Sequence, residues 1–253
     1  MDKKMEDNMN ILELNDVNKW FGGLHVTQNM SFSIKQGETV FVIGPNGAGK
    51  TTLFNLITGF IKPDKGDIRF MGKSIRGLAP YQIAKLGIGR TFQIVKPLLN
   101  MTVLENVMLG AFAHTNSKKE AIEQAMQILE KTNLLSRKDH LARELTLAGK
   151  KRLEIARSLA IRPKLLLLDE VVAGLTPTEA DETIRLFKDL NEAGISTLGG
   201  IEHVMRVVMS VSDRVIVINQ GEKIAEGKPG EIVTNPVVIE AYLGKGAASH
   251  AEN

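Results

Sequence analysis

The chain has 253 residues, of which 43% are hydrophobic and 24% are charged, enough for a buried core in one large domain or two lobes. It contains no cysteine, which excludes a disulfide framework. The 32 basic and 29 acidic residues give a net charge of +3 and are scattered, which argues against nucleic acid as the main ligand. We find no signal peptide in residues 1–10 and no apolar stretch of the roughly 18 to 20 residues that a membrane span needs. We therefore expect a cytosolic protein that reaches a membrane only through a partner.

Short segments of alternating polarity open the chain. Residues 11–14, 30–34 and 39–43 are predicted strands, and Gly22-Gly23 and Gln36-Gly37 interrupt them. A turn is predicted at 63–66, and the strand expected at 67–70 would join the first strands in an antiparallel set.

The strand at 39–43 leads into a glycine-rich loop and then into a helical apolar pattern. The loop and the start of that helix comprise Gly44, Pro45, Asn46, Gly47, Ala48, Gly49, Lys50, Thr51 and Thr52. This is the P-loop pattern, whose backbone N–H groups and helix N-terminus converge on phosphate oxygens. Lys50 supplies a positive charge for the β- and γ-phosphates, and the Thr51 hydroxyl can ligate Mg²⁺. We predict that this loop binds nucleotide phosphates with Mg²⁺; the alternative is a glycine-rich turn without a ligand.

Helical periodicity follows from about residue 81 to residue 162, with apolar groups at 103–108, 122–129 and 153–160. Strand character returns at 164–169, 194–198 and 214–218, and the alternation with helices is typical of a parallel sheet. We therefore predict an α/β fold: a P-loop NTPase core with a parallel sheet, an N-terminal antiparallel β subdomain and an inserted helical subdomain at about 90–162. Residues 10–244 would form this single domain, and residues 245–253 a disordered tail.

The apolar strand at 165–168 ends in two carboxylates, Asp169 and Glu170. In open α/β sheets, ligands bind at the carboxyl ends of the strands, which is also where the P-loop leaves its strand. We expect Asp169 to hold Mg²⁺ through water and Glu170 to act as the general base toward the attacking water. The alternative is that one of them only caps the following helix or turn.

These motifs and their order resemble the ATP-binding domain of ABC transporters over about residues 11–244. The resemblance implies that Gln93 is the Q-loop glutamine, which reaches the metal and the attacking water. It also implies that His203 is the switch histidine, which contacts the γ-phosphate, and that Phe21 stacks on adenine. Trp20 competes with Phe21 for that role from the opposite face of the strand. The structural alternatives are a core aromatic at Phe21 and an ordinary strand-end histidine at His203.

Residues 87–93 (GIGRTFQ), 202–205 (EHVM), 221–227 (GEKIAEG) and 239–244 (IEAYLG) narrow the resemblance to the ATPase subunits of branched-chain amino acid importers. Lipopolysaccharide-export ATPases are similar but lack the Arg-Thr-Phe-Gln form of the Q-loop. The resemblance implies a homo- or heterodimer of ATPase subunits, integral-membrane permease subunits, a separate solute-binding protein and a place at the inner face of the cell membrane.

One segment departs from the family pattern. The family signature Leu-Ser-Gly-Gly-Gln is replaced by LTLAG at residues 145–149. By resemblance this segment, with Thr146, Ala148 and Gly149, binds the γ-phosphate across the dimer, Thr146 keeping the capping hydroxyl. We interpret the departure as a subgroup feature, and impaired catalysis is the alternative. Thr176, where Asp is common, and Gly199-Gly200, where aliphatic residues are common, are further departures.

The sequence thus predicts an ATP-binding and ATP-hydrolysing subunit of an importer, with branched-chain amino acids as the leading substrate class. The apolar stretch at 97–101 is predicted either to dock the permease or to form core of the helical subdomain. The functional alternatives are a lipid or lipopolysaccharide exporter ATPase and a regulatory subunit with impaired ATPase activity. A soluble ATPase of DNA repair or translation would need coiled-coil arms or a second cassette, for which this sequence has no room.

Overall fold

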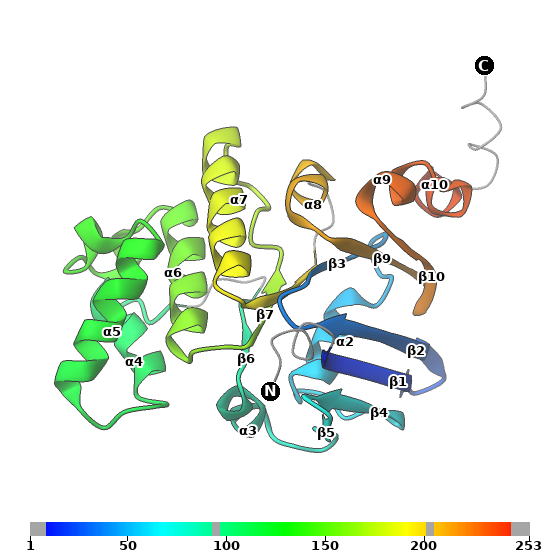
Figure 1. Ribbon diagram of the computed structural model, residues 1–253, viewed down its shortest axis with the longest axis horizontal. Helices are drawn as coiled ribbons and strands as arrows, with labels where there is room; N and C mark the ends of the chain where they lie inside the picture. The colour runs from blue at the N-terminus through cyan, green and yellow to red at the C-terminus, as the bar shows by residue number, and fades with distance from the viewer. Residues whose placement is uncertain (1–8, 93–96, 201–204, 244–253) are drawn as a thin grey trace.

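The computed structural model describes residues 9–92, 97–200 and 205–243, which are arranged around two β-sheets (Figure 1). The smaller sheet has the strand order β2-β1-β4-β5, and all of its pairs are antiparallel. Its strands are β1 (Asn10–Phe21), β2 (Leu24–Lys35), β4 (Lys65–Phe70) and β5 (Lys73–Ser74). The predicted antiparallel set is confirmed, because β1 and β2 turn at Gly22-Gly23 and β4 pairs with β1.

The larger sheet has the order β10-β9-β3-β8-β7-β6 and is parallel except for the hairpin of β9 and β10. Its strands are β3 (Thr39–Ile43), β6 (Ile88–Arg90), β7 (Leu165–Asp169), β8 (Ser196–Gly200), β9 (Arg214–Asn219) and β10 (Glu222–Gly227). Every residue of β3, β7 and β8 is buried, as expected for central strands covered on both faces. The predicted α/β class with a parallel sheet is confirmed.

Strand β6 corrects the expectation of continuous helix from residue 81. Its three residues, Ile88–Arg90, pair in parallel with Leu165–Leu167 of β7. So short a strand carries no measurable period, and its partner lies far away in the sequence. The pairing with β7 therefore makes residues 88–90 a strand.

Nine α-helices occur in the described part of the chain: α2 (Lys50–Ile57), α3 (Pro80–Leu86), α4 (Val103–Ala111), α5 (Lys118–Lys131), α6 (Leu147–Ala160), α7 (Pro177–Glu192), α8 (Met205–Val211), α9 (Pro229–Val233) and α10 (Pro236–Leu243). Helices α4, α5 and α6 correspond to the three predicted helical groups and lie together on the left of Figure 1. Their apolar faces share a core with Val107, Leu129 and Ala156 fully buried.

Alternate residues of the central strands serve two cores on opposite faces of the larger sheet. Phe41 of β3 and Leu166 of β7 pack into the core with α4 to α7. Val40 and Leu167 pack into the core with the antiparallel sheet and α2. This division follows from the period of two in a strand.

The unusual pair Gly199-Gly200 in β8 has a packing explanation. A Cβ on Gly199 would lie 2.2 Å from the ring of Phe41, and one on Gly200 would lie 3.1 Å from the ring of Phe54. The two rings lie in the two different cores. The glycines leave room for large aromatic side chains on both faces, so they do not signal a flexible strand.

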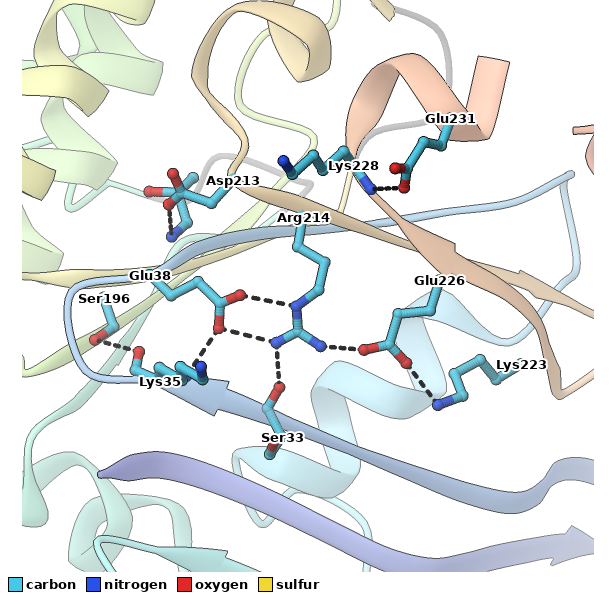
Figure 2. A network of polar contacts seen from close by, with 11 residues as sticks. Ser33, Lys35, Glu38, Ser196, Asp213, Arg214, Lys223, Glu226, Lys228 and Glu231 are labelled. Carbon is cyan, nitrogen blue, oxygen red and sulfur yellow. Dashed lines mark hydrogen bonds and ion pairs between the residues drawn. The ribbon is translucent and has the colours of Figure 1, made fainter. Parts of the chain in front are cut away.

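Arg214 joins the two sheets (Figure 2). Its guanidinium makes a bidentate contact with Glu38, at 2.8 and 2.9 Å, and donates to the carbonyl oxygen of Ser33 in β2 at 2.6 Å. It also pairs with Glu226 of β10, which in turn pairs with Lys223 at 2.6 Å. The hydrogen bonds that Arg214 donates to Glu38 keep the pKa of Arg214 above its ordinary value despite burial. These contacts therefore link β2 of the smaller sheet to β9 and β10 of the larger sheet.

Candidate nucleotide-binding site

The P-loop connects β3 to α2, as predicted. Nζ of Lys50 donates to the carbonyl oxygens of Gly44 at 2.6 Å and Pro45 at 2.9 Å, and the side chain is buried. Asn46, Gly47 and Thr51 are exposed, whereas Pro45 and Thr52 are half-buried and Ala48 is buried. The loop therefore holds a lysine charge beneath a surface open to solvent.

The surrounding backbone demands glycine at two positions of this loop. A Cβ on Gly44 would lie 2.0 Å from the carbonyl oxygen of Ile218, at the end of β9. Gly49, which precedes α2, has φ of 102°, and a Cβ there would lie 2.8 Å from the carbonyl oxygen of Val26 in β2. The loop is thus shaped by contacts with both sheets.

Asp169 and Glu170 lie at the carboxyl end of β7, on the same edge as the P-loop and separated from β3 by β8. Asp169 is buried, and its backbone N–H donates to Oγ1 of Thr91 at 3.0 Å. Glu170 has a φ of 50°, a left-handed conformation that non-glycine residues rarely adopt and that is often found at functional sites. The backbone is thus held by a hydrogen bond at Asp169 and lies in a rare conformation at Glu170.

Lys151 of α6 holds the loop that follows Glu170. Its Nζ donates to the carbonyl oxygen of Glu170 at 2.9 Å and to that of Ala173. Burial lowers the pKa of Lys151, and the charge of Glu170 opposes this shift. The contact ties the start of α6, where the segment 145–149 lies, to the candidate general base.

Arg90, to which no role was predicted from the sequence, contacts the carboxylate of Asp169: its Nη2 lies 2.9 Å from Oδ2 of Asp169. Burial lowers the pKa of the Arg90 guanidinium, and the hydrogen bond with Asp169 opposes that shift. No local pattern signalled this ion pair, because β6 is too short to show a period and Asp169 lies far from Arg90 in the sequence.

Phe21 and Trp20 lie in different surroundings near the tip of the β1–β2 hairpin. Trp20 stacks on His25, with ring centroids 4.1 Å apart and planes at 9°. Phe21 is 46% exposed, and Nζ of Lys19 lies 5.4 Å from its ring centroid. The face of Trp20 is occupied by a neighbour of the same chain, which favours Phe21 for stacking on a ligand.

The segment 145–149 forms the start of α6. Thr146 is the N-cap, and its Oγ1 accepts the N–H of Gly149 at 3.2 Å. Ala148 is 9% exposed, whereas Leu147 is 55% exposed beside Gly174. The departure from the signature thus leaves an ordinary capped helix start, in which the side chain of Ala148 is buried.

Thr176 likewise acts as an N-cap, for α7. Its Oγ1 accepts the N–H of Glu179 at 3.4 Å, and its own N–H donates to the Glu179 carboxylate at 2.8 Å. This backbone donor lowers the pKa of Glu179. Threonine is one of the residues that form this reciprocal capping box, so Thr176 has a structural role at the start of α7.

Three of the predicted features lie outside the described residues, namely Gln93, His203 and the tail.

Phe92, which precedes Gln93, lines an open groove of about 420 Å³ between α3, α4 and α6. Exposed Phe60, Tyr81 and Leu109 line it too. In the stretch 97–101, Leu98 and Leu99 are exposed, Met101 is half-buried and Pro97 is buried, so it contributes to both surface and core.

The structure brings the P-loop, Asp169 and Glu170 to one edge of the parallel sheet, and the segment 145–149 lies at the start of α6. No cluster of three or more His, Cys, Asp or Glu side chains that could hold a metal occurs in the described residues. Mg²⁺ does not require such a cluster, because proteins usually bind it through one or two carboxylates together with substrate phosphates. Asp169 and the Thr51 hydroxyl are oxygen donors of this kind.

None of the described helices is long and apolar enough to cross a membrane.

Two family patterns match the sequence. That of the ABC transporter family matches residues 27–173, which include the P-loop, the segment 145–149 and Asp169-Glu170. That of the branched-chain amino acid ATP-binding cassette transporters matches residues 222–248. The high-affinity branched-chain amino acid transport ATP-binding protein BraF of Pseudomonas aeruginosa is 41% identical over 250 residues, covering 93% of this chain and 98% of the relative.

Solved structures agree with these matches. The ADP conformation of MJ1267, an ATP-binding cassette of an ABC transporter, superimposes with a TM-score of 0.85 at 34% identity, covering 94% of this chain and all of that one. The dimeric structure of a post-hydrolysis state of the cassette MJ0796, bound to ADP and Pi, gives 0.78 at 28% identity, covering 86% of this chain and 98% of that one.

Proposed function

This chain belongs to the ABC transporter ATPases, in the group of the branched-chain amino acid (Liv) type, and we propose that it hydrolyses MgATP to drive branched-chain amino acids through membrane permease subunits. The observation that carries this proposal is the shared edge of β3, β8 and β7, where Lys50 and the pair Asp169-Glu170 lie in a chain that matches both family patterns.

The P-loop would bind the phosphates. The N–H groups of residues 44–49 and the N-terminus of α2 offer donors, and Lys50 exchanges its contacts with loop carbonyls for phosphate oxygens. Thr51, Asp169 and Gln93 would hold Mg²⁺, which neutralises charge on the phosphate oxygens when bound.

Glu170 would accept a proton from the attacking water, because it follows the metal carboxylate directly at the same edge. His203 would contact the γ-phosphate. Phe21 would stack on adenine, supported by its exposed ring and by the pairing of Trp20 with His25.

Two ATPase subunits would close on two ATP molecules. Thr146 fits the role of a donor to the γ-phosphate of the ATP on the other subunit, because a hydroxyl that accepts the N–H of Gly149 still has its own hydrogen to donate. The dimeric structures of related cassettes support such an assembly. The groove lined by Phe60, Tyr81 and Phe92 is the proposed docking surface for the permease.

Reconstitution tests this function. The chain would be purified with its native membrane partners, placed in proteoliposomes with the solute-binding protein, and supplied with labelled leucine or valine. We expect ATP-dependent uptake, and we expect Glu170→Gln to bind ATP while slowing turnover by about 10² to 10⁴, the usual contribution of a general base. Parent-level turnover in that variant would place the base elsewhere, and uptake of no branched-chain amino acid would refute the substrate class.

A further inference from the structure

Arg90 and Asp169 form an ion pair inside the protein. Nη2 of Arg90 lies 2.9 Å from Oδ2 of Asp169, and the two side chains are only 6% and 8% exposed. Two charges are removed from water here, so each depends on the other for compensation. The partner of this arginine is the carboxylate at the proposed Mg²⁺ position.

The same guanidinium also contacts the helix that follows the P-loop. Nη1 donates to Oδ1 of Asn55 at 2.7 Å and to Oγ1 of Thr58 at 3.0 Å. Asn55 lies in α2, and Thr58 is its C-cap. One rigid group therefore joins the end of β7 to the helix that begins with Lys50 and Thr51.

Two aromatic rings flank the guanidinium. The centroid of the Phe54 ring lies 5.7 Å from its central carbon, and that of Phe92 lies 5.0 Å away. Phe92 is 43% exposed in the groove and meets Phe60 edge-on at 5.8 Å. Arg90 thus lies between the groove and the metal carboxylate.

We propose that Arg90 is a positioning residue for hydrolysis: it fixes the carboxylate of Asp169 relative to α2, and Phe92 transmits contacts made in the groove to it. This rests on the proposed function, in which Asp169 serves the metal. Arg90 itself reaches Asp169 and α2, so it acts through Asp169. A lysine could not reproduce this arrangement, because its single ammonium lacks the planar fork that meets Asp169 and Asn55 together.

The first test compares Arg90→Met with Arg214→Met. Both variants remove an arginine from an ion pair that joins separate elements, but Arg214 begins β9, whereas Asp169 ends β7 at the opposite end of the parallel strands. Affinity for a fluorescent ATP analogue is measured in EDTA and in Mg²⁺, and ATPase activity is titrated with Mg²⁺. Thermal unfolding reports the stability of each variant.

We expect Arg90→Met to keep its affinity in EDTA within about twofold, because Arg90 supports the metal carboxylate and not the P-loop amides. The Mg²⁺ concentration for half-maximal turnover should rise by about tenfold, a typical effect of losing a residue that orients a metal ligand. Arg90→Lys should fall between Met and the parent. Arg214→Met should lower the unfolding temperature while its Mg²⁺ requirement stays at the parent value.

The second test concerns the path from the groove. Phe92→Leu removes the aromatic face from Arg90 at an exposed position, so the fold should survive, and Phe92→Tyr keeps the face. The Mg²⁺ requirement should rise by about two- to threefold in the leucine variant, in line with a cation–π contact of partial exposure, and stay unchanged in the tyrosine variant.

An unchanged or lower Mg²⁺ requirement in Arg90→Met, or equal shifts in Arg90→Met and Arg214→Met, would overturn the proposal. If Arg90→Met does not fold, Arg90→Lys and the Phe92 pair decide by the same titration. A parent chain that binds no ATP would instead refute the proposed function, which separates the two failures.

Discussion

The P-loop and the segment 145–149 are both proposed to face phosphate, and they are built differently. In the P-loop, Gly44 and Gly49 are enforced by nearby carbonyl oxygens and, at Gly49, by a φ of 102°. In the segment 145–149, Thr146 caps a regular helix, and Ala148 is buried within it. A glycine is a physical requirement of the first loop, whereas the second adopts its shape without one at position 148.

A residue type in such a motif can be required for two different physical reasons. Where a Cβ would collide with the chain itself, the motif residue is needed to build the site at all. Where it would not, the residue type matters only through the ligand that approaches. Substitutions in the two regions should therefore differ in which measurement they alter.

The largest effect is expected for Lys50→Ala. Nucleotide affinity should fall by at least about 100-fold, because the variant deletes a charge-assisted contact with the β- and γ-phosphates. Isothermal calorimetry measures the affinity, and circular dichroism shows whether the fold persists. Parent-like affinity in a folded variant would refute the assignment of the P-loop.

The next effect concerns the dimer. Leu147 is exposed at the first position of α6, so Leu147→Asp should place a negative charge toward the partner's phosphates at little cost to the fold, since an acidic residue suits a helix N-terminus. We expect ATP-dependent dimerisation in a Glu170→Gln background to weaken by about tenfold or more, from the electrostatic repulsion of like charges. Single-subunit ATP affinity should persist.

Light scattering with and without ATP gives the dimer fraction. The control is Leu147→Asn, which introduces a neutral side chain of the same size as aspartate. It should dimerise much more readily than Leu147→Asp. Undiminished dimerisation of Leu147→Asp would argue against a sandwich in which the segment 145–149 faces the partner's nucleotide.

From the sequence we predicted site residues in the P-loop and at Asp169 and Glu170, because strand, loop and carboxylates are each local patterns that imply their chemistry, and the structure places these residues at one edge of the sheet. The contacts of Arg90 could not be predicted in this way, because its partners Asp169 and Asn55 come from distant parts of the chain. Local patterns also could not explain Gly199-Gly200, since the rings of Phe41 and Phe54 that fill this space belong to other elements. Local motifs reveal chemistry, and the contacts that position it depend on tertiary packing.

A smaller effect is expected for Gly44→Ala, and it should affect stability as well as binding. The new Cβ would lie 2.0 Å from the carbonyl oxygen of Ile218, so the loop or the end of β9 must move. Overpacking of this kind costs about 1–3 kcal/mol of unfolding free energy. Urea unfolding measures the loss, and ATP affinity should fall several-fold through the displaced loop amides. A variant as stable as the parent would mean that this backbone is more adaptable than the structure indicates.

The smallest effect is expected for Ala148→Gly, which restores a family glycine. If the Cβ of Ala148 obstructed the approach of the partner's phosphate, its removal should raise turnover strongly. The side chain is only 9% exposed, however, so it lies inside the protein and leaves the helix N-terminus open. Removing it should lower the unfolding free energy by about 1 kcal/mol, the helix cost of glycine relative to alanine, and leave ATP turnover within about twofold of the parent. Steady-state ATPase assays and urea unfolding on the same preparation test both parts. A tenfold gain in turnover would show that Ala148 restrains catalysis, and the two phosphate-facing regions would then share a need for glycine after all.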